Sequence, residues 1–120
     1  MKKFILVANA EEAKNYFLRK QKELKAELRF GNVTYHKELL EDSNEKCLGG
    51  GIFEIENDRL IMSGCSFDYG YPPFEMDGLK ISCPQECIKE VMIYTMIGEP
   101  YPYNQQEDVD VRKLLKISGN

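Results

Sequence analysis

Apolar and polar positions in the first third of the chain predict a buried strand followed by a long amphipathic helix. Residues 3–8 are β-prone and almost entirely apolar, which is typical of a strand covered on both faces. Over residues 11–29 apolar side chains recur at helical spacings, and two glutamates in the first turn favour the helix dipole. The apolar positions are Ala13, Phe17, Leu24 and Leu28. We expect one helix over residues 11–29, ending before Gly31.

The middle of the chain carries the pattern of a β-hairpin. Residues 47–56 and 59–65 alternate between apolar and polar side chains, and Asn57 and Asp58 separate the two runs. Before the hairpin, residues 33–35 are suited to a short extended stretch and residues 37–42 to one or two helical turns. The pattern therefore places His36 at a boundary between two elements.

The last third predicts a loop and a second helix. Glycines and prolines mark residues 70–78 as a loop, and Ser82 with Gln85 can form a capping box at the start of a helix. The buried stripe of that helix would be Ile88, Val91, Met92 and Thr95. From residue 108 the pattern has two interpretations: Val109 and Val111 alternate as in a strand, whereas Leu114 and Leu115 suit a helix, and we favour a closing strand. We expect a single α/β domain over residues 1–120, with a mixed sheet of about five or six strands flanked by two main helices.

Composition narrows the possible partners. The chain has 120 residues and a formal net charge of −4, so it lacks the basic field of a nucleic-acid-binding protein. Its first apolar run, from Phe4 to Ala8, is shorter than the roughly 7–15 residues of a secretory signal core. No run approaches the ~20 apolar residues of a membrane span. We expect a cytoplasmic protein that binds neither nucleic acid nor membranes.

Four cysteines raise the question of a metal site. In a reducing compartment we expect Cys47, Cys65, Cys83 and Cys87 to be free thiols. Cys83 and Cys87 are four residues apart on a predicted helix, and with the other two they could complete a tetrahedral zinc site. Zinc sites normally show two close pairs, and Cys47 and Cys65 are separated by the hairpin. The sequence therefore predicts no metal and no other cofactor.

The candidate chemistry centres on the single histidine, His36. A neutral imidazole can act as a general base, and consecutive main-chain amides in a tight turn can hold an anion. The amides of Ser66, Phe67 and Asp68, with the Ser66 hydroxyl, could form such a cradle. The structural alternatives are that His36 only bridges backbone groups and that the glycines of residues 49–51 only allow close packing.

The order of these motifs resembles the Janus/Ocnus family of phosphohistidine phosphatase-like proteins. The resemblance extends from about residue 33 to residue 91. It rests on Tyr35-His36, on Cys47-Leu48-Gly49-Gly50-Gly51, and on Gly64-x-Ser66-x-x-Tyr69-Gly70.

The resemblance implies a metal-independent enzyme that hydrolyses phosphohistidine in proteins or small phosphoramidates. His36 would be the general base toward water, and Ser66, Phe67 and Asp68 would hold the phosphate. Lys3 falls where the family carries a phosphate-contacting lysine, and Arg29 lies close to the position of a family arginine.

Two residues depart from the family pattern. Ile52 stands where an arginine follows the triple glycine, and it offers no bidentate contact to phosphate. Asp68 replaces a small neutral residue and adds a negative charge beside the phosphate. The alternative function is therefore a non-catalytic binding or regulatory domain of the same fold.

Overall fold

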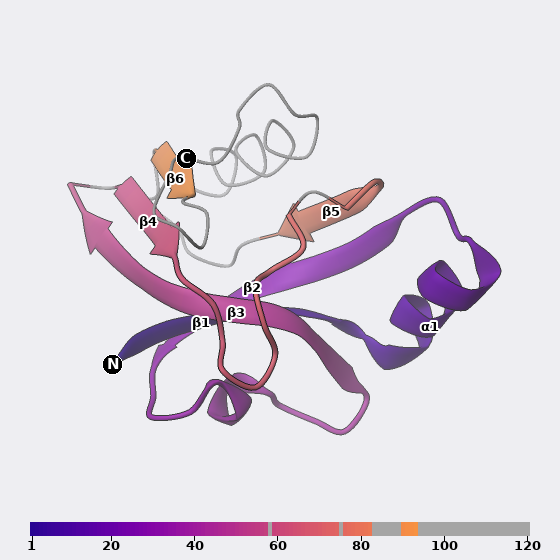
Figure 1. Cartoon of the computed structure of the whole chain (residues 1–120), viewed down its shortest axis with the longest axis horizontal. Helices are drawn as coiled ribbons and strands as arrows, with labels where there is room; N and C mark the ends of the chain where they lie inside the picture. Colours follow the sequence, from indigo (N-terminus) through magenta and orange to yellow (C-terminus); the bar gives the residue numbers. More distant parts are fainter. Residues whose placement is uncertain (58, 75, 83–89, 94–120) are drawn as a thin grey trace.

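A mixed β-sheet of six strands forms the body of the molecule (Figure 1). The computed structural model describes residues 1–57, 59–74, 76–82 and 90–93. The strand order is β5-β2-β1-β3-β4-β6. The four central strands pair antiparallel, and the two edge strands are parallel to their neighbours, β5 to β2 and β6 to β4. The strands are β1 (Lys2–Asn9), β2 (Leu24–Asn32), β3 (Glu45–Glu56), β4 (Arg59–Ser63), β5 (Leu79–Ser82) and β6 (Glu90–Ile93). The predicted α/β class and mixed sheet are confirmed.

The central strand β1 is buried on both faces, as predicted. Five consecutive residues, from Phe4 to Ala8, have exposures of 4% or less. Because side chains alternate along a strand, Phe4, Leu6 and Ala8 enter the main core, whereas Ile5 and Val7 join a smaller cluster with Leu39 on the other face. The same alternation puts Lys3 on the face of Ile5 and Val7.

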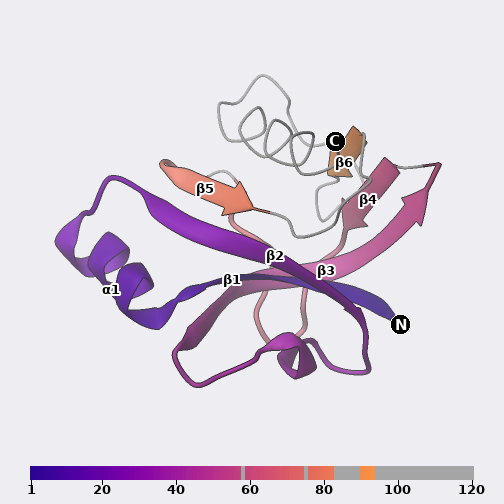
Figure 2. The same ribbon diagram turned by 180° about the vertical axis from the view of Figure 1, so that it is seen from behind.

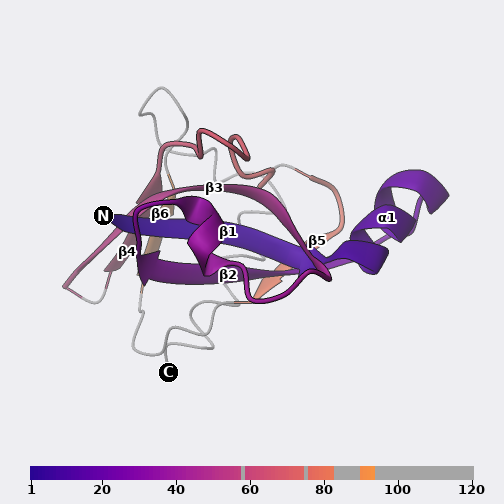
Figure 3. The same cartoon turned by 90° about the horizontal axis from the view of Figure 1, so that it is seen from below.

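That second face is covered by a short 3-10 helix, η1 (His36–Leu39). Figure 3 shows this helical turn lying against β1, and Leu39 packs into the cluster of Ile5 and Val7. The predicted helical turn therefore forms at His36, one residue before the expected range.

The helix predicted over residues 11–29 is wrong in its second half. Helix α1 (Ala10–Arg19) ends at Lys20, whose φ of 55° is left-handed, and the chain continues as β2. Leu24, Ala26 and Leu28 are buried with a period of two and lie in the main core. β2 pairs with β1 over residues 26–32 and with β5 over residues 24–27, so the strand prevails over the helical spacing of Leu24 and Leu28.

Helix α1 extends from one end of the sheet (Figures 1 and 2). The side chain of Asn9 caps it by accepting hydrogen bonds from the Glu11 amide at 2.9 Å and the Glu12 amide at 3.3 Å. No helix in the described part of the chain is both long and apolar enough to cross a membrane.

The predicted hairpin is confirmed, whereas the second helix is wrong where the structure describes it. Strands β3 and β4 pair antiparallel, and Asn57 adopts a left-handed φ of 51° at the turn. Glu90–Ile93, which the prediction assigned to the helix, form β6 beside β4. The other residues of the predicted helix beyond Ser82, and the closing strand predicted from residue 108, lie outside the described residues. Strand β5 was not predicted.

The glycines of β3 allow neighbouring chains to approach closely. A Cβ on Gly49 would lie 2.7 Å from the Pro72 Cα, and one on Gly50 would lie 2.5 Å from the Phe4 carbonyl oxygen. A Cβ on Gly51 would collide with the Ser63 carbonyl oxygen. The structural explanation of this glycine run is therefore confirmed.

Replacing Gly51 by alanine tests this packing. The added methyl group would also lie 3.1 Å from the Gly64 carbonyl oxygen, so we expect Gly51→Ala to lower the free energy of unfolding by about 1–3 kcal/mol in urea titrations. In the control Gly31→Ala the nearest atom, 2.6 Å away, is a Leu39 methyl that can move, and we expect a change within about 1 kcal/mol. Equal effects of the two substitutions would contradict the explanation.

Candidate functional site

A cavity of about 400 Å³ lies beside η1 and brings together four of the predicted site residues. Lys3 reaches it from β1, His36 from the start of η1, and Phe67 and Asp68 from the loop that follows β4. We call it the His36 cavity. Ser66 and Arg29, the other two predicted residues, are not among its lining residues.

One ring nitrogen of His36 is hydrogen-bonded, and the other is unpaired within the described residues. The residue is only 7% exposed, and its Nε2 lies 2.9 Å from the carbonyl oxygen of Gly51. Because a carbonyl oxygen only accepts, Nε2 carries the proton and donates, which leaves a lone pair on Nδ1 of the neutral ring. Within the described residues Nδ1 has no hydrogen-bond partner, and the only fully buried side-chain atom without one is Arg29 Nε. Nδ1 therefore keeps some solvent exposure, and His36 is one of the residues that line the cavity.

The backbone around His36 is fixed from both sides. The Glu38 carboxylate accepts hydrogen bonds from the Thr34 amide at 2.9 Å and the Tyr35 amide at 2.6 Å, directly before the histidine. On the other side the ring approaches Gly50 so closely that a Cβ there would lie 2.9 Å from His36 Cδ2. The imidazole is thus positioned by its own turn and by the bare backbone of β3.

Lys3 contributes the positive charge of the cavity. Its ammonium group donates to the Thr34 carbonyl oxygen at 2.5 Å, which places it beside the segment that leads into His36. An ammonium group has three donors, so two remain for an anion. Lys3 is the only lysine or arginine among the lining residues in the described part of the chain.

The loop after β4 presents two free amides but not the predicted three. Ser66 and Gly70 form a bridge with hydrogen bonds of 3.1 and 2.9 Å, and the Ser66 hydroxyl accepts from the Tyr69 amide at 3.2 Å. Ser66 is 2% exposed, so its amide and hydroxyl serve the turn. Within the described residues the amides of Phe67 and Asp68 have no hydrogen-bond partner.

The loop is also attached to the glycine strand. The Gly50 amide donates to the Gly70 carbonyl oxygen at 3.2 Å. Because Gly50 also receives the His36 ring, the imidazole and the loop share the same support on β3.

The two departures from the family pattern both face the cavity. Ile52 is 43% exposed on its wall, and Asp68 places an acidic side chain on its lining. One lysine and one aspartate therefore nearly cancel in side-chain charge, and main-chain amides carry much of any attraction for an anion.

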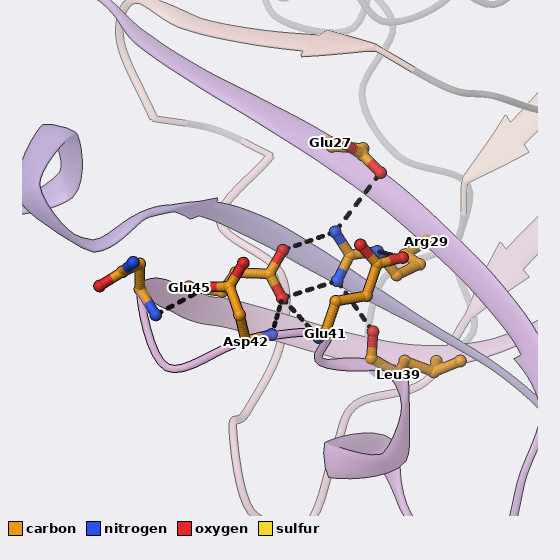
Figure 4. Close-up of polar contacts among 7 residues, drawn as sticks. Glu27, Arg29, Leu39, Glu41, Asp42 and Glu45 are labelled. Atoms are coloured by element: carbon orange, nitrogen blue, oxygen red, sulfur yellow. Dashed lines mark hydrogen bonds and ion pairs between the residues drawn. The ribbon is translucent and has the colours of Figure 1, made fainter.

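Arg29 lies in a different place, with its guanidinium surrounded by carboxylates (Figure 4). It donates to Glu45 at 2.9 and 2.7 Å in a bidentate pair and to the Leu39 carbonyl oxygen at 2.9 Å. Glu27 and Glu41 lie 3.5 and 3.7 Å away. The group borders a second cavity of about 360 Å³. Arg29 thus joins β2 to the start of β3 and to the end of η1.

The Arg29 contact changes the acidity of its main partner. Hydrogen bonds from Arg29, together with those from the amides of Glu41 and Asp42, lower the pKa of Glu45 from 4.5 to about 2. Burial opposes this shift but does not outweigh it.

The described cysteines do not form a metal centre. Within the described residues no group of three or more histidine, cysteine, aspartate or glutamate side chains is arranged to hold a metal ion. Cys65 is exposed and lines the His36 cavity, and Cys47 is half-buried in β3. Cys83 and Cys87, the other members of the zinc alternative, lie outside the described residues.

The Arg29–Glu45 pair should make the protein sensitive to acid. Because the pKa of Glu45 is lower in the folded protein, its stabilising effect is complete above about pH 5 and is lost as the pH falls toward 2. We expect Glu45→Gln to lower the free energy of unfolding by about 1–3 kcal/mol at pH 7, and by progressively less below pH 5. Urea titrations at several pH values measure this.

The control for that experiment is Glu54→Gln, which changes an exposed glutamate on the same strand. We expect an effect of at most about 0.5 kcal/mol at pH 7. A loss for Glu45→Gln that is no larger, or that does not depend on pH, would contradict the assignment.

The two described thiols should react at different rates. Burial raises the pKa of Cys47, whose Sγ also donates to the Gly49 carbonyl oxygen at 3.4 Å, whereas Cys65 is open to the cavity. We expect iodoacetamide at pH 8 to modify Cys65 at least about tenfold faster than Cys47, measured by mass spectrometry of peptides. Equal rates would show that β3 does not protect Cys47.

Comparison with known proteins gives no relative: no protein-family model, no curated protein and no solved structure matches the chain. The resemblance to the Janus/Ocnus family therefore rests on the motifs alone, and any functional proposal rests on the residues of the His36 cavity.

Proposed function

We propose that the protein is a metal-independent phosphatase of the phosphohistidine type, acting in the His36 cavity. The observation that carries the proposal is that four residues line one cavity: His36, whose Nε2 is bound to the Gly51 carbonyl, Lys3, and the loop residues Phe67 and Asp68. These are a base, a cation and main-chain donors, which together match the needs of phosphoryl transfer to water.

The reaction needs few catalytic groups because the phosphorus–nitrogen bond is labile. Cleavage passes through a loose transition state with charge on the three equatorial oxygens of the phosphoryl group. Water attacks phosphorus while Nδ1 of His36 takes its proton. The electron pair of the P–N bond goes to the leaving imidazole nitrogen, which then receives that proton. The products are inorganic phosphate and neutral histidine, and His36 returns to its starting state.

The bond from Nε2 to the Gly51 carbonyl supports this role. It fixes the tautomer, so the lone pair of the neutral ring is on Nδ1, the nitrogen left for a base. As Nδ1 gains a proton, the Nε2–H···O bond becomes charge-assisted and stronger. The carbonyl therefore stabilises the imidazolium that forms in the reaction.

The charge of the cavity favours a second candidate, a non-catalytic phosphate-binding or regulatory domain. Ile52 supplies no cation, and Asp68 offsets the charge of Lys3. Such a domain would bind a phosphorylated side chain but would not hydrolyse it.

A phosphohistidine peptide tests the two candidates. The enzyme should release phosphate in EDTA, and His36→Ala should reduce kcat at least about 100-fold because the base is lost. Phosphate release is measured against the spontaneous rate without protein. Release by the unmutated protein at the spontaneous rate would leave the binding domain as the function.

A matched pair of lysine variants tests the cation. Lys3→Ala should raise KM about tenfold, since a charge-assisted contact to the phosphoryl group is lost. The control is Lys2→Ala, which removes the exposed lysine directly before Lys3 in β1, on the opposite face of the strand. Equal changes in KM would argue against a specific role for Lys3.

A further inference from the structure

The His36 cavity is surrounded by exposed apolar side chains. Seven large apolar side chains are exposed in the described part of the chain, and four of them line this cavity. They are Met1 at 77%, Tyr35 at 57%, Ile52 at 43% and Phe67 at 102% exposed. We call these four residues the apolar collar.

Phe67 is the most exposed member, and it lies in a turn whose two ends are hydrogen-bonded to each other. It lies inside the turn closed by the Ser66–Gly70 bridge, and that turn is bound to Gly50 in β3. A phenyl ring that is fully exposed to water buries no apolar surface in the isolated protein. Apolar groups gathered around one cavity are typical of a surface that binds a partner.

The charges around the collar limit the kind of partner. A nucleic acid or an anionic membrane presents many phosphates and needs several cations, but the cavity holds one lysine and one aspartate. The formal net charge of −4 also opposes both. A protein segment that carries one phosphorylated side chain between apolar neighbours fits a single anion site inside an apolar rim.

We propose that the apolar collar binds the residues flanking the phosphorylated side chain, so that the protein selects protein segments with aliphatic or aromatic residues next to that side chain. This inference deepens the proposed function and rests on it. The phosphoryl group enters between His36 and the amides of the loop, and the neighbouring side chains lie on Ile52, Phe67 and Tyr35. Free phosphoramidates lack these neighbours and are poorer substrates.

Two isoleucines of β3 give a matched test. Ile52 and Ile55 are both 43% exposed, but only Ile52 lines the cavity. The substrates are a phosphohistidine peptide with leucine on both sides, the same peptide with serine on both sides, and free phosphohistidine. We expect the leucine peptide to have a kcat/KM at least about tenfold above the serine peptide.

The preference for the leucine peptide should depend on Ile52 and not on Ile55. Ile52→Ser should lower the ratio of kcat/KM between the leucine and serine peptides about fivefold, whereas Ile55→Ser should leave the ratio unchanged. Equal kcat/KM values for the two peptides, or equal effects of the two substitutions, would overturn the collar. Free phosphohistidine hydrolysed as well as the leucine peptide would overturn it too.

A binding experiment separates the collar from catalysis. The probe is the leucine peptide with a non-hydrolysable phosphonate in place of phosphohistidine, and its affinity is measured by calorimetry. If the protein hydrolyses none of the substrates but binds this peptide, and Ile52→Ser weakens binding about fivefold relative to Ile55→Ser, the catalytic proposal fails and the collar stands. No difference between the two variants overturns the collar. Binding to vesicles with anionic lipids is measured in parallel. Binding to the vesicles but not to the peptide would also overturn the proposal for the collar.

Discussion

The hydrogen bond between His36 Nε2 and the Gly51 carbonyl is the interaction on which the candidate site depends. It forms only because β3 has no side chains at Gly50 and Gly51, where a Cβ would meet the imidazole, the Phe4 carbonyl or the Ser63 carbonyl. The same segment holds the loop after β4, because the Gly50 amide donates a hydrogen bond to the Gly70 carbonyl oxygen. One segment without side chains therefore sets the position of the imidazole and of the loop relative to each other.

The second constraint acts on the other end of η1. Arg29 donates to the carbonyl oxygen of Leu39, the last residue of η1, and holds Glu45 at the start of β3. The Leu39 side chain meanwhile packs on Ile5 and Val7. An arginine that the family resemblance assigned to phosphate thus stabilises the turn that carries the histidine. Because three carboxylates already surround its guanidinium, it has little attraction left for an anion.

Much of this architecture could be predicted from local patterns, and the failures have a common cause. The first strand was predictable because its short, β-prone apolar run is typical of a strand buried on both faces. The hairpin was predictable because strict alternation of apolar and polar residues indicates a strand. Leu24 and Leu28 fit a helix and a strand equally well, and only pairing with the distant strands decides between them: Leu28 pairs with Leu6 of β1, and Leu24 pairs with Leu79 of β5. In the site, the alternation of β1 already puts Lys3 on one face with Ile5, but the burial of Ser66 depends on how the turn closes against β3. The collar joins residues from four separate segments, so no single motif could have predicted it.

The weak side-chain charge of the cavity and its apolar collar both bear on the binding energy of a substrate. In the proposed function, a phosphoryl group with about two negative charges would meet one lysine side chain and one aspartate, so the reacting group alone would bind poorly. Contacts with neighbouring side chains can supply the missing binding energy without touching the reacting atoms, and binding energy from remote parts of a substrate can be used to orient its reactive centre. Phe67 would serve both functions under this proposal, because its amide is unpaired within the described residues and its side chain belongs to the collar. We therefore expect a phosphatase built in this way to discriminate by the residues around the phosphate more than by the phosphate itself.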